Sequence, residues 1–347
     1  MSLKLPKVVV LPDAGSENPF QYELVRYLQK NGMEVVIGQK HTLGSTFRTL
    51  KAHQPDVLYY DWIHSFILGK SLPLSWLKSL VFVAEIIYSR YFYRVKIVHT
   101  LHNLQNHAGI WLNLESVIYG FFLRQCHQIR VYNEATKVAA VERFDLQPSR
   151  IKIIQDLPYH FYYENKYSKK ESRKKLNLSN KQFVYLFFGE LKPYKGLQNL
   201  LRAYTHIAQP NDCLVIAGKS YDADYFASLQ ALAKPLSNVI FHHRFIEDDE
   251  VQVFLNAADV VVLPFVRIDH SGSIDLAMSF GKPIVTLKTA TTAQLLAHQL
   301  SLLFDTPEQL DGCLKNAKSI DDEAIGQQNF KKADTTNYQA ILQLFVV

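Results

Sequence analysis

Short apolar runs alternate with amphipathic segments along the chain. Lys7–Leu11 is a valine-rich run, and Pro19–Gln29 carries apolar residues at helical spacing after Asn18, which suits an N-cap. Further strands are predicted over Glu34–Ile37, Asp56–Tyr60 and Lys96–Thr100. Because helices separate the strands, the pattern predicts parallel sheets covered by helices on both faces.

The alternation restarts after a polar, charge-rich stretch at residues 164–182. Strands are predicted over Phe183–Phe188, Cys213–Ala217, Val239–Phe241, Val260–Pro264 and Ile284–Leu287, with a helix over Gly196–Ile207. A chain of 347 residues that is 48% hydrophobic can bury two such cores. We therefore predict an α/β protein with domains at 1–165 and 166–330, and a C-terminal segment at 331–347 that packs back towards the first domain.

The segment Leu72–Tyr93 is almost wholly apolar. On a helix, Lys78, Glu85 and Ser89 share one narrow stripe, which leaves a wide apolar face typical of helices at a membrane interface. The alternative is a helix buried between domains. Charged residues interrupt any spanning stretch, so the pattern predicts peripheral membrane contact through Leu72–Arg94.

Charge is divided unevenly along the chain. Residues 1–166 hold 19 Lys and Arg against 13 Asp and Glu, and this excess equals the whole net charge of +6. A basic half suggests an anionic partner, either nucleic acid or a membrane surface, with unpatterned surface charge as the alternative. The cysteines Cys126, Cys213 and Cys313 form no CxxC pair, which fits a reducing cytosol.

Two stretches in the second half suggest an anion-binding site. In FFGELKPYKG, residues 187–196, a strand runs into Gly189, Lys192 and Lys195 supply positive charge, and Gly196 opens a helix. Glycine lets a backbone approach a ligand closely, and ligands bind beyond the carboxyl ends of parallel strands. The alternative is an ordinary strand–loop–helix turn with solvated lysines.

The second stretch follows the strand that ends at Pro264. A polar loop with Asp269 and His270 leads into a helix predicted from Ile274 to Gly281. The helix start, with Ser271, Gly272 and Ser273, offers backbone and hydroxyl donors to a phosphate. Asp275 is placed to accept hydrogen bonds from ribose hydroxyls, unless Ser273 and Asp275 merely cap the helix.

Candidate catalytic groups in the first half follow predicted strands. His99 and His102 lie at one strand end, where a histidine can polarise a sugar hydroxyl, and a core histidine is the alternative for either. Asp13 and Asp61 are candidates for a general base, although a loop acid or helix cap has the same pattern. No residue cluster has metal-ligand spacing, and no G-x-G-x-x-G follows Leu11.

The two C-terminal stretches resemble the second domain of GT-B glycosyltransferases, in particular bacterial exopolysaccharide and cell-surface members of the group-1 (GT4-like) class. FFGELKPYKG resembles their phosphate-binding loop, and HSGSIDLAMSFGKPIV resembles their donor-binding element. Asn18-Pro19-Phe20, the DVLYYDW strand end and HTLHN at His99–Asn103 agree in order, and His102 matches the family position. The resemblance implies two Rossmann-like, doubly wound domains facing a cleft.

The resemblance also implies an activity: metal-independent transfer of a sugar, expected to be a hexose, from a nucleotide diphosphate sugar to a glycan or lipid-linked acceptor. The expected setting is cell-surface polysaccharide synthesis in the cytoplasm or at the cytoplasmic face of the inner membrane, with no cofactor and no nucleic acid. Glu190 stands where the family has arginine, and Arg267 and Asp275 stand where it has paired glutamates. A nucleotide-sugar epimerase and a non-catalytic binding module of the same fold remain as alternatives.

Overall fold

The computed structural model describes residues 5–15, 19–106, 109–268, 271–334 and 339–346. The chain forms two compact units, one of Met1–Leu157 with Asn337–Val347 and one of Pro158–Thr336. The division thus falls before the predicted boundary at 165/166. Asn18, Asp269 and His270, which the sequence places next to helix starts, lie outside the described residues.

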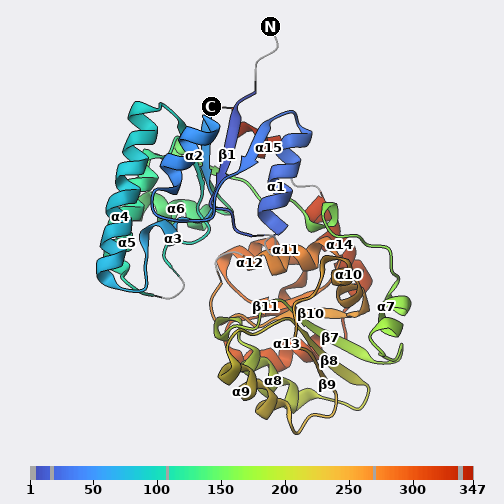
Figure 1. The fold of residues 1–347 in the computed structure, drawn as a ribbon. Helices are drawn as coiled ribbons and strands as arrows, with labels where there is room; N and C mark the ends of the chain where they lie inside the picture. Colours follow the sequence, from blue (N-terminus) through green and yellow to red (C-terminus); the bar gives the residue numbers. More distant parts are fainter. Residues whose placement is uncertain (1–4, 16–18, 107–108, 269–270, 335–338, 347) are drawn as a thin grey trace. The chain divides into compact units, whose positions relative to one another are not determined.

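The first unit contains a six-stranded parallel sheet in the order β2-β1-β3-β4-β5-β6 (Figure 1). Its strands are β1 (Lys7–Leu11), β2 (Glu34–Ile37), β3 (Val57–Tyr60), β4 (Lys96–Thr100), β5 (Gln128–Val131) and β6 (Ile151–Ile153). Its helices are α1 (Pro19–Lys30), α2 (Ser45–His53), α3 (His64–Ile67), α4 (Leu72–Ile87), the π-helix η1 (Tyr88–Phe92), α5 (Leu112–Gln125), α6 (Glu134–Phe144), η2 (Pro148–Arg150) and α15 (Gln339–Gln343).

The two faces of this sheet carry separate cores, as alternating strand residues require. Val9 and Leu11 of β1 point into a core that α2 to α6 cover, whereas Val8 and Val10 point to the opposite face. There α1 packs together with α15, whose Ile341 is buried in the same core. The last helix of the chain therefore completes the first unit.

The second unit repeats the arrangement, with strand order β12-β11-β10-β7-β8-β9. Its strands are β7 (Phe183–Phe188), β8 (Asp212–Ala217), β9 (Val239–His242), β10 (Val260–Leu263), β11 (Ile284–Leu287) and β12 (Leu303–Phe304). Its helices are η3 (Tyr159–Phe161), α7 (Lys169–Lys175), η4 (Pro193–Lys195), α8 (Leu197–Ile207), α9 (Ala223–Ala233), α10 (Asp248–Ala257), α11 (Gly272–Ser279), α12 (Ala290–Leu295), η5 (Ala297–Leu302), η6 (Pro307–Gln309), α13 (Leu310–Asn316) and α14 (Asp322–Asp334). Each unit is therefore a doubly wound α/β domain.

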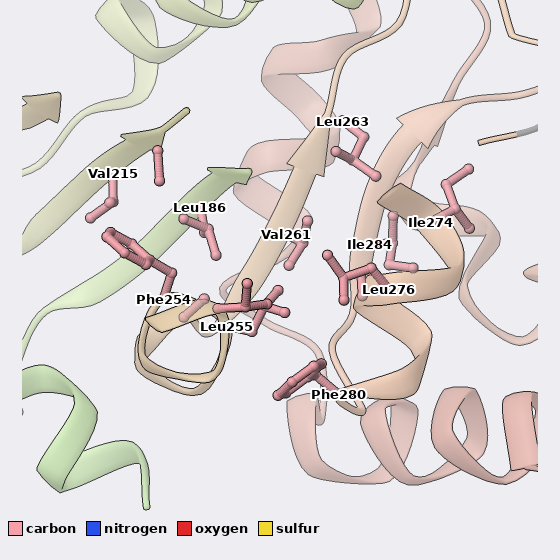
Figure 2. Close-up of a cluster of buried hydrophobic side chains, with 14 of the residues drawn as sticks. Leu186, Val215, Phe254, Leu255, Val261, Leu263, Ile274, Leu276, Phe280 and Ile284 are labelled. Atoms are coloured by element: carbon pink, nitrogen blue, oxygen red, sulfur yellow. The ribbon is translucent and has the colours of Figure 1, made fainter. Parts of the chain in front are cut away.

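One face of the second sheet is held by α10 and α11 (Figure 2). Phe254 of α10 packs beside Leu186 of β7, and Ile274 of α11 lies near Leu263 at the end of β10. These side chains are all buried, and burying each large apolar side chain contributes about 1.5–3 kcal/mol. The packing fixes the first turn of α11 next to the carboxyl end of β10.

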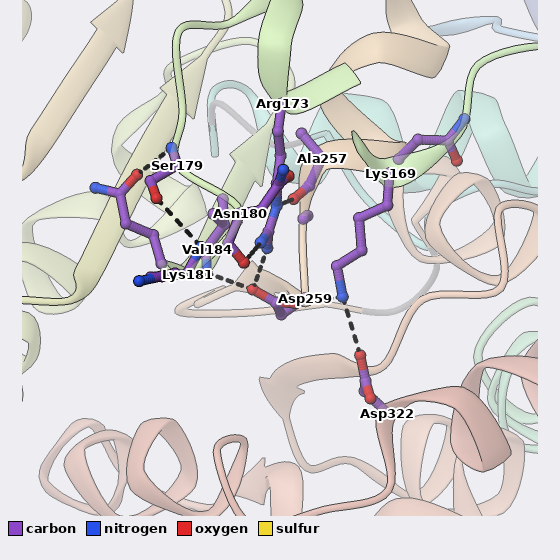
Figure 3. A network of polar contacts seen from close by, with 12 residues as sticks. Lys169, Arg173, Ser179, Asn180, Lys181, Val184, Ala257, Asp259 and Asp322 are labelled. Carbon is purple, nitrogen blue, oxygen red and sulfur yellow. Dashed lines mark hydrogen bonds and ion pairs between the residues drawn. The ribbon is translucent and has the colours of Figure 1, made fainter. Parts of the chain in front are cut away.

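A buried ion pair joins the amino ends of β7 and β10 (Figure 3). Arg173 of α7 donates to Asp259 at 2.6 Å and to the carbonyl of Ala257 at 3.0 Å. The same Asp259 carboxylate accepts the backbone N–H of Val184 at 2.6 Å, and Lys169 pairs with its other oxygen at 2.6 Å. This cluster lies at the amino ends of the strands, away from their carboxyl ends. It therefore stabilises the packing of β7 against β10.

Candidate functional site

Both predicted donor-binding stretches lie at the point where the strand order of the second sheet reverses. From β7 the chain continues to β8 and β9 on one side, and from β10 to β11 and β12 on the other. Gly189 directly follows β7, and the loop after β10 leads to Ser271 at the start of α11. Open α/β sheets bind ligands beyond the carboxyl ends of strands at such a reversal.

Lys195 and Ser273 converge on Gly189. A methyl group placed on Gly189 would lie 2.9 Å from Nζ of Lys195 and 3.6 Å from Oγ of Ser273. The Lys195 ammonium and the Ser273 hydroxyl thus both lie close to the backbone of Gly189, although the two residues are far apart in sequence. Gly189 also has φ +127°, a conformation that side chains disfavour. Two donors beside a half-buried backbone segment can together bind a phosphate group.

The Lys195 ammonium is buried without a carboxylate to neutralise it. The side chain is 9% exposed, and within the described residues no acid lies within ion-pair distance of its Nζ. Burial, which outweighs attraction to Glu190, lowers the pKa of Lys195 to about 8. A buried cation costs free energy unless an anion accompanies it, so this lysine is poised to bind one.

Two further glycines hold the loops together at this edge of the sheet. A Cβ at Gly196 would lie 1.9 Å from the carbonyl oxygen of Pro264, and one at Gly218 would lie 2.0 Å from that of Gly189. Backbone from β7, β8 and β10 is therefore in direct contact, and larger residues would separate it. The predicted role of Gly196 as the residue that opens a helix agrees with its place as the N-cap of α8.

The start of α11 is held by its own cap and by Tyr159. Ser271 is the N-cap, and its hydroxyl accepts the N–H of Ser273 at 3.2 Å. A methyl group on Gly272 would meet the Tyr159 hydroxyl at 2.6 Å, so Gly272 leaves room for that ring. Asp275 lies in the first helical turn, where the helix dipole favours a carboxylate. α11 begins at Gly272, two residues before the predicted Ile274, because Ser271 takes the capping role.

Lys192 occupies the same loop as Lys195 but differs in environment. Its Nζ pairs with Glu190 at 2.8 Å, and both side chains are at least one-third exposed. An exposed pair of this kind contributes about 0–1 kcal/mol, so Lys192 can exchange its partner at little cost. Glu190, which stands where the family resemblance predicts arginine, is thus the ion-pair partner of Lys192.

In the first unit, the structure joins two of the predicted catalytic residues. Asp61 follows β3 and His102 follows β4, and His102 Nε2 lies 2.6 Å from Asp61 Oδ1. A carboxylate only accepts, so Nε2 carries the hydrogen and Nδ1 accepts the hydroxyl of Tyr132 at 3.0 Å. Asp61 is fully buried, and its second oxygen has no hydrogen-bond partner among the described residues. A carboxylate that orients an imidazole is the arrangement of a general base.

Aromatic residues that the sequence analysis did not identify surround this pair. Trp62 stacks on His102 with ring centroids 4.8 Å apart, and Phe20 meets His102 edge-on at 6.0 Å. The buried Arg130 guanidinium lies 5.0 Å from the Tyr132 ring centroid and pairs with Asp156 at 2.5 Å. In the sequence, Trp62 directly follows Asp61 at the end of DVLYYDW. This adjacency could have identified Trp62 as a site residue.

The remaining candidates of the first unit have local partners. His99 is a core histidine, whose ring nitrogens lie 2.8 Å from the Tyr60 carbonyl and 2.9 Å from the Tyr119 hydroxyl. Burial lowers the pKa of His99 to about 3, so it stays neutral. Asp13 lies after β1 and accepts the N–H of Gly15 at 2.9 Å. No group of three or more metal-ligating side chains gathers anywhere in the described ranges.

Known proteins match parts of this chain in sequence. The family model of glycosyl transferases group 1 matches residues 168–332. An uncharacterized glycosyltransferase of Methanocaldococcus jannaschii is 25% identical over 53% of this chain and 48% of its own length. A GDP-mannose:glycolipid 4-beta-D-mannosyltransferase of Xanthomonas campestris pv. campestris is 25% identical over 29% of each chain. This chain thus matches about half, or less, of the length of these relatives.

The fold extends the likeness to the whole chain. Anabaena HepE, solved in complex with UDP-glucose, superposes with a TM-score of 0.73 over 98% of both chains at 17% sequence identity. At that identity the likeness shows the fold alone. The second unit thus matches the family model of glycosyl transferases group 1, and the two doubly wound domains of the chain have a GT-B fold.

Proposed function

We propose that this protein transfers a hexose from a nucleoside diphosphate sugar to a glycan or lipid-linked acceptor. The convergence of Lys195 Nζ and Ser273 Oγ over Gly189 carries the proposal, because it places a buried cation and a hydroxyl beside bare backbone. The diphosphate would lie on this group and on the start of α11. Asp275 would accept hydrogen bonds from the ribose, and Lys192 would exchange Glu190 for phosphate oxygen.

The chemistry requires an acceptor hydroxyl oxygen to bond to the anomeric carbon while the bond from that carbon to the diphosphate breaks. Negative charge then grows on the leaving diphosphate, where Lys195 and the positive end of α11 offset it without a metal. His102 would take the proton of the acceptor hydroxyl on Nδ1, in exchange for the Tyr132 hydroxyl, with Asp61 stabilising the imidazolium.

The similar proteins support the classes of donor and acceptor. HepE was solved with UDP-glucose, and the Xanthomonas campestris enzyme is named for GDP-mannose and a glycolipid. For this protein we propose the same classes: a nucleoside diphosphate hexose as donor and a glycolipid as acceptor. The base of the donor can be uracil or guanine. A glycolipid acceptor would place the enzyme in the cytoplasm at the inner face of the membrane, in the synthesis of a cell-surface polysaccharide, with peripheral contact through Leu72–Arg94.

A product assay tests the proposal. The purified full chain is incubated with a panel of UDP-, GDP-, ADP- and dTDP-hexoses, with and without a membrane lipid extract, and both nucleotide and sugar products are identified. We expect nucleoside diphosphate release that the lipid extract stimulates, sugar in the lipid fraction, and unchanged rates in EDTA. Isomerised nucleotide sugar without release would instead indicate an epimerase. Binding without any turnover would indicate a binding module.

A further inference from the structure

The outward face of α4 and η1 is apolar along its whole length. The exposed residues between Leu72 and Tyr93 are leucines, isoleucine, alanine, proline and aromatic residues, and none is charged. We call Trp76, Leu77, Leu80, Ile87, Tyr91 and Phe92 the α4 apolar face. Helices at a protein surface ordinarily expose polar side chains to water. In α4 the exposed side chains are apolar instead.

The serine and lysine side chains of α4 bond to the residues just before the helix, and Ser89 of η1 bonds within the helix itself. Ser75 accepts the N–H of Gly69 at 2.9 Å, Ser79 donates to the carbonyl of Ile67 at 3.3 Å, and Lys78 donates to that of Leu68 at 2.7 Å. Ser89 donates to the carbonyl of Glu85 at 2.6 Å. In the stripe that the sequence predicts as polar, Glu85 and Ser89 are therefore buried, and Lys78 is half-buried and bonded to Leu68.

Glu85 fixes the direction in which α4 presents its faces. Its buried carboxylate accepts the N–H groups of Thr46 at 2.7 Å and Phe47 at 3.1 Å, in the first turn of α2. A carboxylate at a helix N-terminus is stabilised by the helix dipole. Turning α4 to hide its apolar residues would leave this carboxylate buried without those donors, at a large cost in free energy. The hydrogen bonds of Glu85 to α2 thus keep the apolar face of α4 exposed to solvent.

The neighbouring helix also has exposed apolar residues. α5 packs beside α4 (Figure 1), and Trp111, Leu112 and Val117 are exposed at its start. Lys70 and Arg94, at the two ends of the α4 segment, are also exposed. Glu85 is the sole acidic residue between them in the sequence, and it is buried. The surface therefore combines an apolar centre with positive ends.

We propose that the α4 apolar face, with the start of α5, is a docking surface for an anionic lipid bilayer. Tryptophan and tyrosine settle at the level of the lipid headgroups, leucine and phenylalanine enter the acyl region, and Lys70 and Arg94 meet anionic headgroups. The net charge of +6, all from the first half of the chain, favours the same occupant over a second, equally basic copy.

The helix lies along the membrane plane and does not cross the bilayer. By length and composition Leu72–Phe92 could span one, since it is 21 residues long and contains an 18-residue window with a mean hydropathy of 1.3. Its inward face, however, is bonded to α2 through Glu85, to the loop before α4 through Ser75, and to the end of α3 through Ser79. A spanning orientation would break these bonds and place a carboxylate in hydrocarbon, which the bilayer disfavours.

Vesicle flotation tests the surface without donor or acceptor, so its outcome is separate from that of the proposed transferase activity. The full chain is mixed with vesicles of phosphatidylcholine alone or with phosphatidylglycerol. We expect flotation that needs phosphatidylglycerol and weakens in about 0.5 M salt. The double variant Trp76→Ser with Leu80→Ser should lower the partition coefficient at least about tenfold.

The matched control is Tyr221→Ser with Leu300→Ser in the second unit. These two side chains are 65% and 52% exposed, against 51% and 64% for Trp76 and Leu80, so each pair removes a similar exposed apolar surface. Unchanged melting temperatures show that both variants are folded. The proposal is overturned if wild type does not float, if both variants lose flotation equally, or if the Trp76/Leu80 variant floats like wild type. A wild-type dimer that this variant converts to monomers, with no flotation of either, would assign the surface to a second copy.

Discussion

Replacing Lys195 with methionine removes the ammonium and keeps most of the side chain's length. Losing a charge-assisted hydrogen bond to phosphate costs about 1.5–3 kcal/mol, which is roughly a 10- to 150-fold increase in the dissociation constant. The effect should appear equally for a nucleoside diphosphate and for its sugar conjugate, because both carry the phosphates that Lys195 contacts. Isothermal titration with UDP and GDP measures it directly.

The same substitution should raise the free energy of unfolding of the protein in the absence of nucleotide. Burial lowers the pKa of Lys195 from 10.5 to about 8, so folding disfavours the charged form. That cost is fully present below about pH 8 and disappears as the pH rises towards 10.5, where the unfolded chain also loses the proton. Methionine removes a cost on the order of 3 kcal/mol at neutral pH, seen as a higher melting temperature.

Wild-type affinity for the nucleoside diphosphate should also fall as the pH rises above about 8, because Lys195 then loses its proton. The methionine variant should lack this pH dependence. Lys234→Met, at an exposed lysine at the end of α9, is the matched control and should change neither affinity nor its pH profile. Unchanged nucleotide affinity in Lys195→Met would refute the diphosphate site.

Three further substitutions separate binding, catalysis and folding. Gly189→Ala should weaken nucleotide binding, since the new methyl group would lie 2.9 Å from Lys195 Nζ at φ +127°; calorimetry that shows wild-type affinity would contradict this. Asp61→Asn should lower the transfer rate about 100-fold or more and alter its pH profile, with donor affinity unchanged, because an amide no longer fixes the His102 tautomer; an unaltered rate would argue against that role. Arg173→Met should lower unfolding stability by about 3 kcal/mol with nucleotide affinity retained, because it leaves the Asp259 carboxylate buried; equal stability in a urea titration would show that the pair contributes little.

Strands buried on both faces were the elements that the sequence predicted best. Lys7–Leu11 and Phe183–Phe188 have the predicted bounds, because central parallel strands are continuous apolar runs with clear ends. The direction of α4 was not predictable in this way. Periodicity shows that Glu85 and Ser89 share a stripe, but the donors that draw the stripe inward belong to α2, a separate element.

In the candidate sites, contacts between residues close in sequence were predictable, whereas contacts between residues far apart in sequence were not. Gly189 and Lys195 belong to one short motif, so sequence alone places them together. His102 and Asp61 are 41 residues apart, and only the pairing of β3 with β4 brings them into contact. Trp62 and Tyr132 were missed because their role depends on their contacts with His102, which the sequence pattern does not contain.

The proposed transfer requires that the second unit hold the diphosphate of a nucleotide sugar beside Gly189. A crystal structure of the full chain with UDP, GDP or the sugar nucleotide that the product assay identifies tests this claim most directly. We expect phosphate oxygens within about 3 Å of Lys195 Nζ and of the Ser273 hydroxyl or the N–H groups at the start of α11. A nucleotide bound elsewhere in the chain, with Lys195 still buried and without an anion, would contradict it.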